Sequence, residues 1–281
     1  MAFIAIIGAG ALGGAVAHAI ARRDRVPEVR LIDSSGSVAA GKALDMLQSS
    51  PIEHFSTRVT AADSIAAAVG ARVIVIADRA TDSAEHDGEA GLALLRTLIA
   101  SGADAPVVCA GAGHRELIAR AVTELRVTGS RIVGSAPLAL ESALRALTGV
   151  ALDRSGTEVT LSVVGVPPRS AVVAWEEATA GGQPLTSQLP AHTIAQLSSK
   201  IAGLWPPGPY ALGTAAARIV EAMTFGSRRR FTCFVAMQSG PVRAAVTAMP
   251  VELREGGVAR VLEPALTRQE RTMLENALEK A

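Results

Sequence analysis

The fold is decided by residues 3–14, FIAIIGAGALGG, and the other elements are inferred outward from them. The stretch opens with five apolar residues, Phe3–Ile7, which suit a central strand of a parallel sheet that is buried on both faces. Three glycines follow in the order G-x-G-x-x-G, namely Gly8, Gly10 and Gly13. Residues 15–22 are rich in alanine and lack glycine and proline, so they predict a helix.

A glycine-rich turn between a buried strand and a helix is typical of a dinucleotide-binding site. The first glycine permits the tight turn, the second lets the backbone approach a pyrophosphate, and the third lets helix and strand pack closely. The phosphates are expected at the unpaired N–H groups of the helix N-terminus. The residues of this turn that we predict to bind the cofactor are Gly8, Gly10, Ala11, Leu12 and Gly13.

An acidic residue follows at the spacing that such a site requires. The second predicted strand, residues 29–32, ends at Asp33, which lies 20 positions after Gly13 (33 − 13 = 20). An acid about 20 residues after the glycines binds the ribose of NAD, and its charge would repel the 2′-phosphate of NADP. The glycine pattern alone is often only a turn, but strand, helix and acid occur here together. The sequence therefore predicts NAD as the cofactor.

The composition indicates a globular protein with an aliphatic core. The chain has 281 residues, which is enough for one large or two medium domains. Hydrophobic residues make up 49% and aromatic residues only 3%, so the core must consist mainly of Ala, Val, Leu and Ile. A net charge of +1 gives no basic footprint for nucleic acid, and we expect no nucleic-acid partner.

Cysteine usage and the N-terminus bear on the compartment. Cys109 and Cys233 lie in apolar runs, which predicts buried free thiols in a reducing compartment, and the sequence has no metal-type Cys and His cluster. Residues 1–21 carry no charged side chain, but they lack a basic n-region and contain four glycines, so a signal or membrane segment is not expected. We expect a soluble cytoplasmic protein with no membrane partner.

As far as residue 136, predicted strands alternate with predicted helices. Further strands are expected at residues 57–60, 73–77, 106–110 and 131–134, and helices at 38–48, 64–69, 92–100 and 116–125. This alternation predicts βαβ units on a doubly wound parallel sheet. Residues 1–136 are therefore expected to form a Rossmann-type dinucleotide-binding domain of α/β class.

From residue 137 the alternation is lost. Helices are expected at residues 137–147, 192–204, 212–223 and 267–280, and strands at 159–164, 171–177, 230–237 and 244–251. The strand at 171–177 is expected to pair antiparallel with 159–164, and a turn at 239–241 to join the last two strands. Residues 137–281 are thus predicted to form an α+β substrate domain.

The order of these segments resembles the lactate/malate dehydrogenase family over essentially the whole chain. Residues 6–21, IIGAGALGGAVAHAIA, are similar to the opening of that family, and residues 41–51, GKALDMLQSSP, to its next helix, which forms a subunit contact. Residues 248–270, AMPVELREGGVARVLEPALTRQE, are similar to its closing hairpin and helix. The resemblance implies a dinucleotide domain, a substrate domain, and a homodimer or homotetramer.

The resemblance also implies a reaction, the transfer of a hydride between NAD and C2 of a 2-hydroxy acid. Family members use a His as general base near neutral pKa and an Asp that orients it. One Arg pairs with the substrate carboxylate, another on a mobile loop polarises the carbonyl, and an Asn steadies the substrate oxygen.

In this sequence the positions of the family's base and carboxylate-binding residues hold other side chains. The His should end the strand at 159–164, where residues 164–168 read VGVPP. The Asp and the Arg should lie on the helix after Gly134, where Leu140 and Ala143 stand. Neither Val nor Leu nor Ala can carry a proton or a charge, so these positions cannot perform the family's chemistry.

Two charged residues lie near these positions. Glu141 and Arg145 are each displaced from the expected place, and one residue of shift turns a side chain by about 100° around a helix. Their spacing of four fits a surface ion pair, and we expect that role for them.

The loop after residue 76 and the turn after residue 110 also depart from the family pattern. Residues 80–89, ATDSAEHDGE, hold four acids and no Lys or Arg where two arginines are expected, so the loop would repel a substrate carboxylate. Residues 110–113, AGAG, stand where the Asn is expected. We therefore assign no catalytic residue and expect the family activity to be weakened or lost.

Alternatives remain open at three residues. His114, at the expected nicotinamide end, and His86, in the acidic loop, would be the acid/base groups of an active NAD-dependent oxidoreductase on a non-standard substrate. Otherwise they are ordinary helix-start and loop histidines.

The family keeps a small residue near the cofactor phosphates, where this chain reads Ala77-Asp78-Arg79. Arg79 is a candidate cofactor-binding residue that either pairs with a phosphate or blocks it; a scaffold without nucleotide is the third hypothesis.

Overall fold

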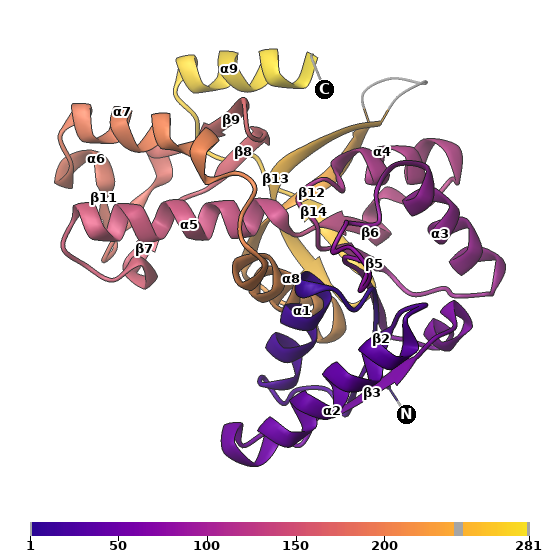
Figure 1. Ribbon diagram of the computed structural model, residues 1–281. Helices are drawn as coiled ribbons and strands as arrows, with labels where there is room; N and C mark the ends of the chain where they lie inside the picture. The colour runs from indigo at the N-terminus through magenta and orange to yellow at the C-terminus, as the bar shows by residue number, and fades with distance from the viewer. Residues whose placement is uncertain (1, 239–243, 280–281) are drawn as a thin grey trace.

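The computed structural model describes residues 2–238 and 244–279, and its dominant feature is one sheet that runs through both halves of the chain (Figure 1). Six parallel strands form its first part in the order β3-β2-β1-β4-β5-β6. Their bounds are Ile4–Ile7 (β1), Glu28–Ile32 (β2), Arg58–Ala62 (β3), Val73–Ile76 (β4), Val107–Cys109 (β5) and Ile132–Gly134 (β6). The predicted doubly wound parallel sheet is confirmed.

Helices cover both faces of this parallel part. Helix α1 lies on one face, against β1 and β2, whereas α3 and α4 lie on the other (Figure 1). This arrangement follows from right-handed βαβ crossovers that leave β1 in opposite directions. The elements are α1 (Ala11–Ala21), α2 (Gly36–Glu53), the 3₁₀ turns η1 (Ile65–Ala68) and η2 (Gly129–Arg131), α3 (Gly88–Ala100) and α4 (Arg115–Glu124).

Antiparallel strands extend the sheet beyond β6. The order continues β12-β13-β8-β9, and β14 pairs with β13. These strands are β8 (Val163–Val166), β9 (Ser170–Val173), β12 (Arg230–Gln238), β13 (Ala244–Arg254) and β14 (Gly257–Val261), and a separate small sheet holds β7 (Val159–Thr160), β10 (Thr179–Ala180) and β11 (Gln183–Pro184). The expected antiparallel pairing of 171–177 is confirmed only for Ser170–Val173, because Trp175–Glu177 forms a 3₁₀ turn. The single strand expected at 159–164 is wrong, since β7 and β8 belong to different sheets. The turn expected at 239–241 lies outside the described residues.

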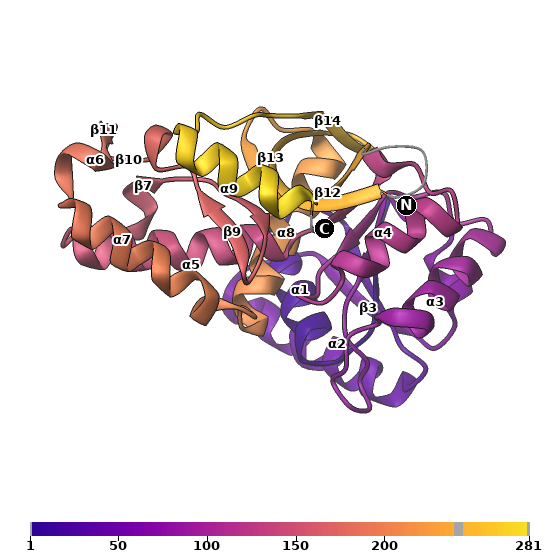
Figure 2. The same cartoon turned by 90° about the horizontal axis from the view of Figure 1, so that it is seen from above.

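Helices of the second half pack in two places. Helix α8 lies along α1, whereas α5 and α7 lie side by side and extend away from the main sheet (Figures 1 and 2). A second apolar cluster fills the space between α5, α7 and the small sheet. The bounds are α5 (Ala136–Ala151), α6 (Leu185–Gln188), α7 (Ala191–Lys200), α8 (Pro209–Phe225) and α9 (Arg268–Glu279), with 3₁₀ turns η3 (Gly156–Glu158), η4 (Trp175–Glu177) and η5 (Ile201–Leu204).

Helix α2 is longer than the segment 38–48 that the sequence predicts. It continues through Pro51, and the hydroxyl of Ser50 donates to the carbonyl of Leu47, the acceptor that the missing N–H of Pro51 leaves open. Its buried residues are Ala39, Ala43 and Met46, and the face with Leu44 and Leu47 is exposed.

The buried thiols that the composition predicts can be compared with the fold. Cys109 and Cys233 are buried free thiols, as predicted. Among the described residues no helix is long and apolar enough to cross a membrane, and no group of side chains is suited to hold a metal ion.

Candidate functional site

The candidate site lies at the carboxyl ends of the parallel strands, beside the point where strand order reverses between β1 and β4. In open α/β sheets ligands bind in the crevice at this point. Four segments meet here: the glycine turn after β1, Asp33 after β2, residues 77–87 after β4, which we call the acidic loop, and the turn at 110–114 after β5.

The glycine turn has the geometry that its sequence predicts. Gly8 has a φ of +104°, a left-handed conformation that glycine adopts without strain. A Cβ atom on Gly13 would lie 2.0 Å from the carbonyl oxygen of Gly8, so only glycine lets α1 approach β1 this closely. The turn and the start of α1 thus form as expected for a phosphate cradle.

A side chain of the chain itself fills this cradle. The carboxylate of Asp78 accepts hydrogen bonds from the backbone N–H groups of Leu12, at 3.0 Å, and Gly13, at 2.8 Å. The Asp78 side chain is buried, and a Cβ atom on Gly10 would lie 2.4 Å from its carboxylate. The N–H groups predicted to hold a pyrophosphate are therefore paired with an internal anion.

The predicted ribose acceptor is also engaged by backbone. The buried Asp33 carboxylate accepts hydrogen bonds from the N–H groups of Ala9 (2.9 Å), Ser35 (2.8 Å) and Ala80 (3.0 Å). Burial by itself raises the pKa of Asp33, but these three donors outweigh it and hold the pKa below its ordinary value. One of the three, Ala80, belongs to the acidic loop.

The turn after β5 receives a second carboxylate from the same loop. Glu85 accepts hydrogen bonds from the N–H groups of Ala112 and Gly113, each at 2.8 Å. A Cβ atom on Gly111 would lie 2.3 Å from the Glu85 carboxylate. Burial, helped by the charges of Asp87 and Asp78, raises the pKa of Glu85 against the effect of the two donors.

The structure separates Arg79 from the other predicted cofactor-binding residues. Its guanidinium forms hydrogen bonds with the Asp82 carboxylate at 3.1 and 2.9 Å, on the outer side of the loop. The sequence pattern predicted a role for Arg79 but not for Asp78 or Glu85. The only signal for Asp78 was an acid at a position where the family keeps a small residue. The only signal for Glu85 was the unusually acidic composition of its loop.

Neither candidate histidine is exposed as an acid/base group. His114 is fully buried, its Nδ1 accepts the N–H of Gly111 at 3.0 Å, and its Nε2 has no hydrogen-bond partner. The Nε2 atom lies 3.9 Å from Oε2 of Glu85. Burial, with a small contribution from His86, lowers the pKa of His114 to about 3, and burial likewise lowers the pKa of the half-buried His86. Both rings are therefore neutral at physiological pH.

The positions at which the resemblance implies substrate-binding groups are buried in the core. Leu140 is fully buried in the second apolar cluster, and Val163 and Val164 are buried before the segment at 165–168. Gly165 accepts the hydroxyl of Thr247 through its carbonyl at 3.0 Å. The strand end that would present the family's base is thus held by strand packing and carries no titratable group.

The prediction that Glu141 and Arg145 form a surface ion pair is wrong. Glu141 is buried and accepts the Thr232 hydroxyl, whereas Arg145 donates from Nε to the Val159 carbonyl at 2.7 Å. Burial raises the pKa of Glu141 to about 7, although Thr232 and the charge of Arg145 oppose this shift. The spacing placed both residues on α5 correctly but could not show that β12 packs over one of them.

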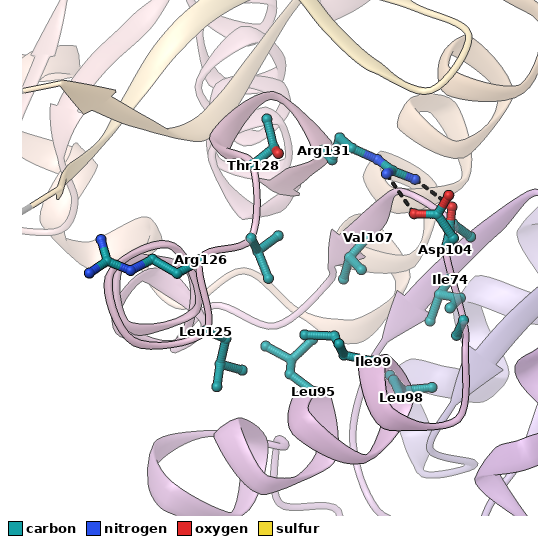
Figure 3. A pocket seen from close by; sticks show the side chains of 13 residues that line it. Ile74, Leu95, Leu98, Ile99, Asp104, Val107, Leu125, Arg126, Thr128 and Arg131 are labelled. Atoms are coloured by element: carbon teal, nitrogen blue, oxygen red, sulfur yellow. Dashed lines mark hydrogen bonds and ion pairs between the residues drawn. The ribbon is translucent and has the colours of Figure 1, made fainter.

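A separate cavity of about 240 Å³ lies at the other edge of the sheet (Figure 3). It is lined by Leu95, Leu98 and Ile99 of α3 and by residues at the starts of β4 and β5. Arg131 bonds to the Asp104 carboxylate at 2.7 Å beside it. Because dinucleotides bind at the carboxyl ends of the strands, this cavity is not part of the candidate site.

Strand order, glycine turn and acid after β2 define a protein of the Rossmann-type dinucleotide-binding class. Comparison with known proteins narrows this class. The family described as lactate/malate dehydrogenase, NAD binding domain, matches residues 2–97. The chain is 26% identical over 292 residues to a malate dehydrogenase of Thermomicrobium roseum, covering 96% of this chain and 93% of the relative. It is 25% identical over 294 residues to L-lactate dehydrogenase A of Rhizopus oryzae, covering 98% and 90%.

Solved structures agree. The malate dehydrogenase of Salinibacter ruber superposes with a TM-score of 0.86 at 25% identity, over 99% of this chain and 94% of the other. The minor L-lactate dehydrogenase of Enterococcus mundtii gives 0.84 at 19% identity, over 99% and 96%, a similarity of fold. Residues 2–97 match the NAD-binding domain of lactate/malate dehydrogenases, for which NAD is the cofactor, and the chain is similar to members of that family over nearly its whole length.

The cleft as described does not fit the pyrophosphate of that cofactor. The two N–H groups at the start of α1 are paired with the Asp78 carboxylate. The same carboxylate fills the space beside Gly10 that the absence of a Cβ atom leaves open. Ala80 covers Asp33, and Glu85 fills the turn after β5. Room for the dinucleotide requires movement of the acidic loop.

Proposed function

We propose that this chain is an NAD-binding member of the family in which the oxidation and reduction of 2-hydroxy acids is greatly weakened or lost. The observation that carries the proposal is the replacement of the side chains that the reaction needs. Leu140 stands where an orienting carboxylate is expected, Ala143 where a carboxylate-binding guanidinium is expected, and residues 165–168 hold no imidazole. Without these groups substrate is neither anchored nor deprotonated.

The loss of acid/base chemistry alone has a large expected effect. A positioned general acid or base contributes about 10²–10⁴ to the rate. The buried His114, whose pKa lies at about 3, cannot replace such a group near neutral pH. The acidic loop adds repulsion, because Asp82, Glu85 and Asp87 would face an anionic substrate where the family has arginines.

The proposal is tested by NADH oxidation with oxaloacetate and with pyruvate, with the malate dehydrogenase of Salinibacter ruber assayed in parallel. We expect turnover at most about 10⁻³ of that enzyme's, since base and anion-binding groups are both missing. Robust turnover of either 2-oxo acid contradicts the proposal.

A second function is favoured by one contact. The Nε2 atom of His114 lies 3.9 Å from the Glu85 carboxylate, which is an imidazole and a carboxylate in proximity. Opening of the loop carries Glu85 away and uncovers His114, so that His114, or His86, would serve as the acid/base group of an oxidoreductase that acts on an uncharged substrate. Turnover of NADH with neutral ketones that is abolished by His114→Gln would favour this function over the first.

We further propose a cytoplasmic homodimer or homotetramer, divided into domains 1–136 and 137–281. Support comes from α2, whose Leu44 is 57% and Ile52 79% exposed on the helix that resembles the family's subunit contact. Light scattering of the intact chain tests the assembly. A monomeric mass, or a mass unchanged by Leu44→Glu, contradicts a contact through α2.

A further inference from the structure

We propose that the acidic loop is an internal occupant of the dinucleotide cleft, with Asp78 in the place of a phosphate, so that NAD binds only when the loop is displaced. This inference rests on the proposed NAD binding but not on the proposed loss of activity. It makes Asp78 the residue that sets dinucleotide affinity, a role that the glycine motif alone does not reveal.

The first support is the chemistry of the Asp78 contacts. A phosphate at a helix N-terminus accepts hydrogen bonds from backbone N–H groups and is stabilised by the helix dipole. The Asp78 carboxylate has the same charge sign and accepts from Leu12 and Gly13 at 3.0 and 2.8 Å. In addition its backbone carbonyl accepts the N–H of Gly10 at 3.0 Å. The internal anion thus satisfies the donors that an external phosphate would use.

The second support is that the same device occurs twice. Glu85 pairs with the N–H groups of Ala112 and Gly113, as Asp78 does with those at the start of α1. In each case only glycine leaves space for the carboxylate. A Cβ atom on Gly10 would lie 2.4 Å from the Asp78 carboxylate, and one on Gly111 would lie 2.3 Å from the Glu85 carboxylate. The space that glycine opens for a cofactor is filled at both turns by one loop.

The third support is that the loop is braced in place. Its two sides are joined by hydrogen bonds from the N–H of Arg79 to the carbonyl of Ala84 at 2.9 Å and from that of His86 to Ala77 at 3.2 Å. Ala80 binds Asp33, and the Arg79–Asp82 ion pair closes the outer end. Displacement therefore breaks several hydrogen bonds together, and a dinucleotide that enters without displacement meets the charge of Asp78.

The test is NADH binding by the full chain, followed by calorimetry and NADH fluorescence without any substrate. Asp78→Gly restores a small residue, and we expect it to bind NADH about tenfold or more tightly than the wild type, as the loss of two charge-assisted hydrogen bonds to the occupant implies. Asp78→Asn keeps the shape and removes the charge, so its gain should be smaller. Asp104→Asn, an equal charge change at an exposed residue away from the acidic loop, is the matched control and should bind like the wild type.

Each result has a consequence. Equal affinity of wild type and Asp78→Gly overturns the inference, and so does the absence of binding in all variants, because the loop would then not be what limits affinity. If thermal melting shows that Asp78→Gly is unfolded, the comparison of Asp78→Asn with Asp104→Asn decides. Turnover by the wild type would contradict the proposed function without bearing on this binding comparison.

Discussion

The start of α5 and the acidic loop have departed from the family pattern in opposite ways. At α5, Leu140 stands where the resemblance implies a carboxylate, and it is fully buried in an apolar cluster. At the loop, Asp78 stands where the resemblance implies a small residue, and its carboxylate is bound by backbone N–H groups. A lost side chain leaves nothing to satisfy, whereas the N–H groups of a helix N-terminus persist in any sequence and still need an acceptor. The chain supplies that acceptor itself.

The largest expected effect comes from restoring a carboxylate at α5. Leu140→Asp places an unpaired charge in the core, and we expect a loss of about 4 kcal/mol or more in the free energy of unfolding. Ser142→Asp, an exposed position on the same helix, is the control and should stay within about 0.5 kcal/mol. Urea unfolding measures both. Tolerance of Leu140→Asp would mean that a substrate pocket persists at α5, contrary to the burial of Leu140 in the core.

The pH dependence of stability should reveal Glu141. Its pKa is raised to about 7 in the folded chain, so the native state holds the proton more tightly than the unfolded state. The stability contributed is complete below the ordinary pKa of about 4.5 and is lost as pH rises through about 7, a change of about 3 kcal/mol. Glu141→Gln should remove this decline between pH 4.5 and 8 in urea titrations. The same decline in both proteins would show that another group is responsible.

The close contact between Gly10 and the Asp78 carboxylate can be tested by adding a methyl group at Gly10. Gly10→Ala brings a methyl group to 2.4 Å from the Asp78 carboxylate, and we expect destabilisation by about 1–3 kcal/mol. The double variant with Asp78→Gly should recover most of that loss, since the two residues share one contact. Gly41→Ala, in α2 with open space around it, is the control and should not destabilise. If the changes in the free energy of unfolding caused by Gly10→Ala and Asp78→Gly were additive, the two residues would not share a contact.

The smallest expected effect concerns Arg79. In the Asp78→Gly background, Arg79→Ala should change NADH affinity by less than about threefold, because the guanidinium pairs with Asp82 at the surface. Calorimetry measures the change. A loss of about tenfold would instead support the prediction that Arg79 pairs with a cofactor phosphate.

The sequence predicted elements where the pattern is local. Apolar runs gave β1 and β4, and the glycine spacing gave the turn and the start of α1. Strand β14 (Gly257–Val261) was missed because a short charged edge strand has no apolar run, and the continuation of α2 past Pro51 depended on a hydroxyl that satisfies Leu47.

The candidate site was predictable only in its backbone. The pairings of Asp78 with Leu12 and of Glu85 with Ala112 join residues 66 and 27 positions apart, so no helical or strand period encodes them. Similarly, the spacing of Glu141 and Arg145 gave their helix face but not the strand β12 that buries the acid. What the sequence did show was where the family's polar groups are missing.

Turnover by Asp78→Gly with NADH and saturating oxaloacetate separates the blocked cofactor cleft from the missing catalytic groups most directly. This variant should bind NADH, so any remaining inactivity belongs to the substrate half of the cleft. We expect tight NADH binding with turnover at most about 10⁻³ of the Salinibacter ruber enzyme. Turnover that approaches the rate of that enzyme would contradict it, because the loop alone would then have concealed a working dehydrogenase.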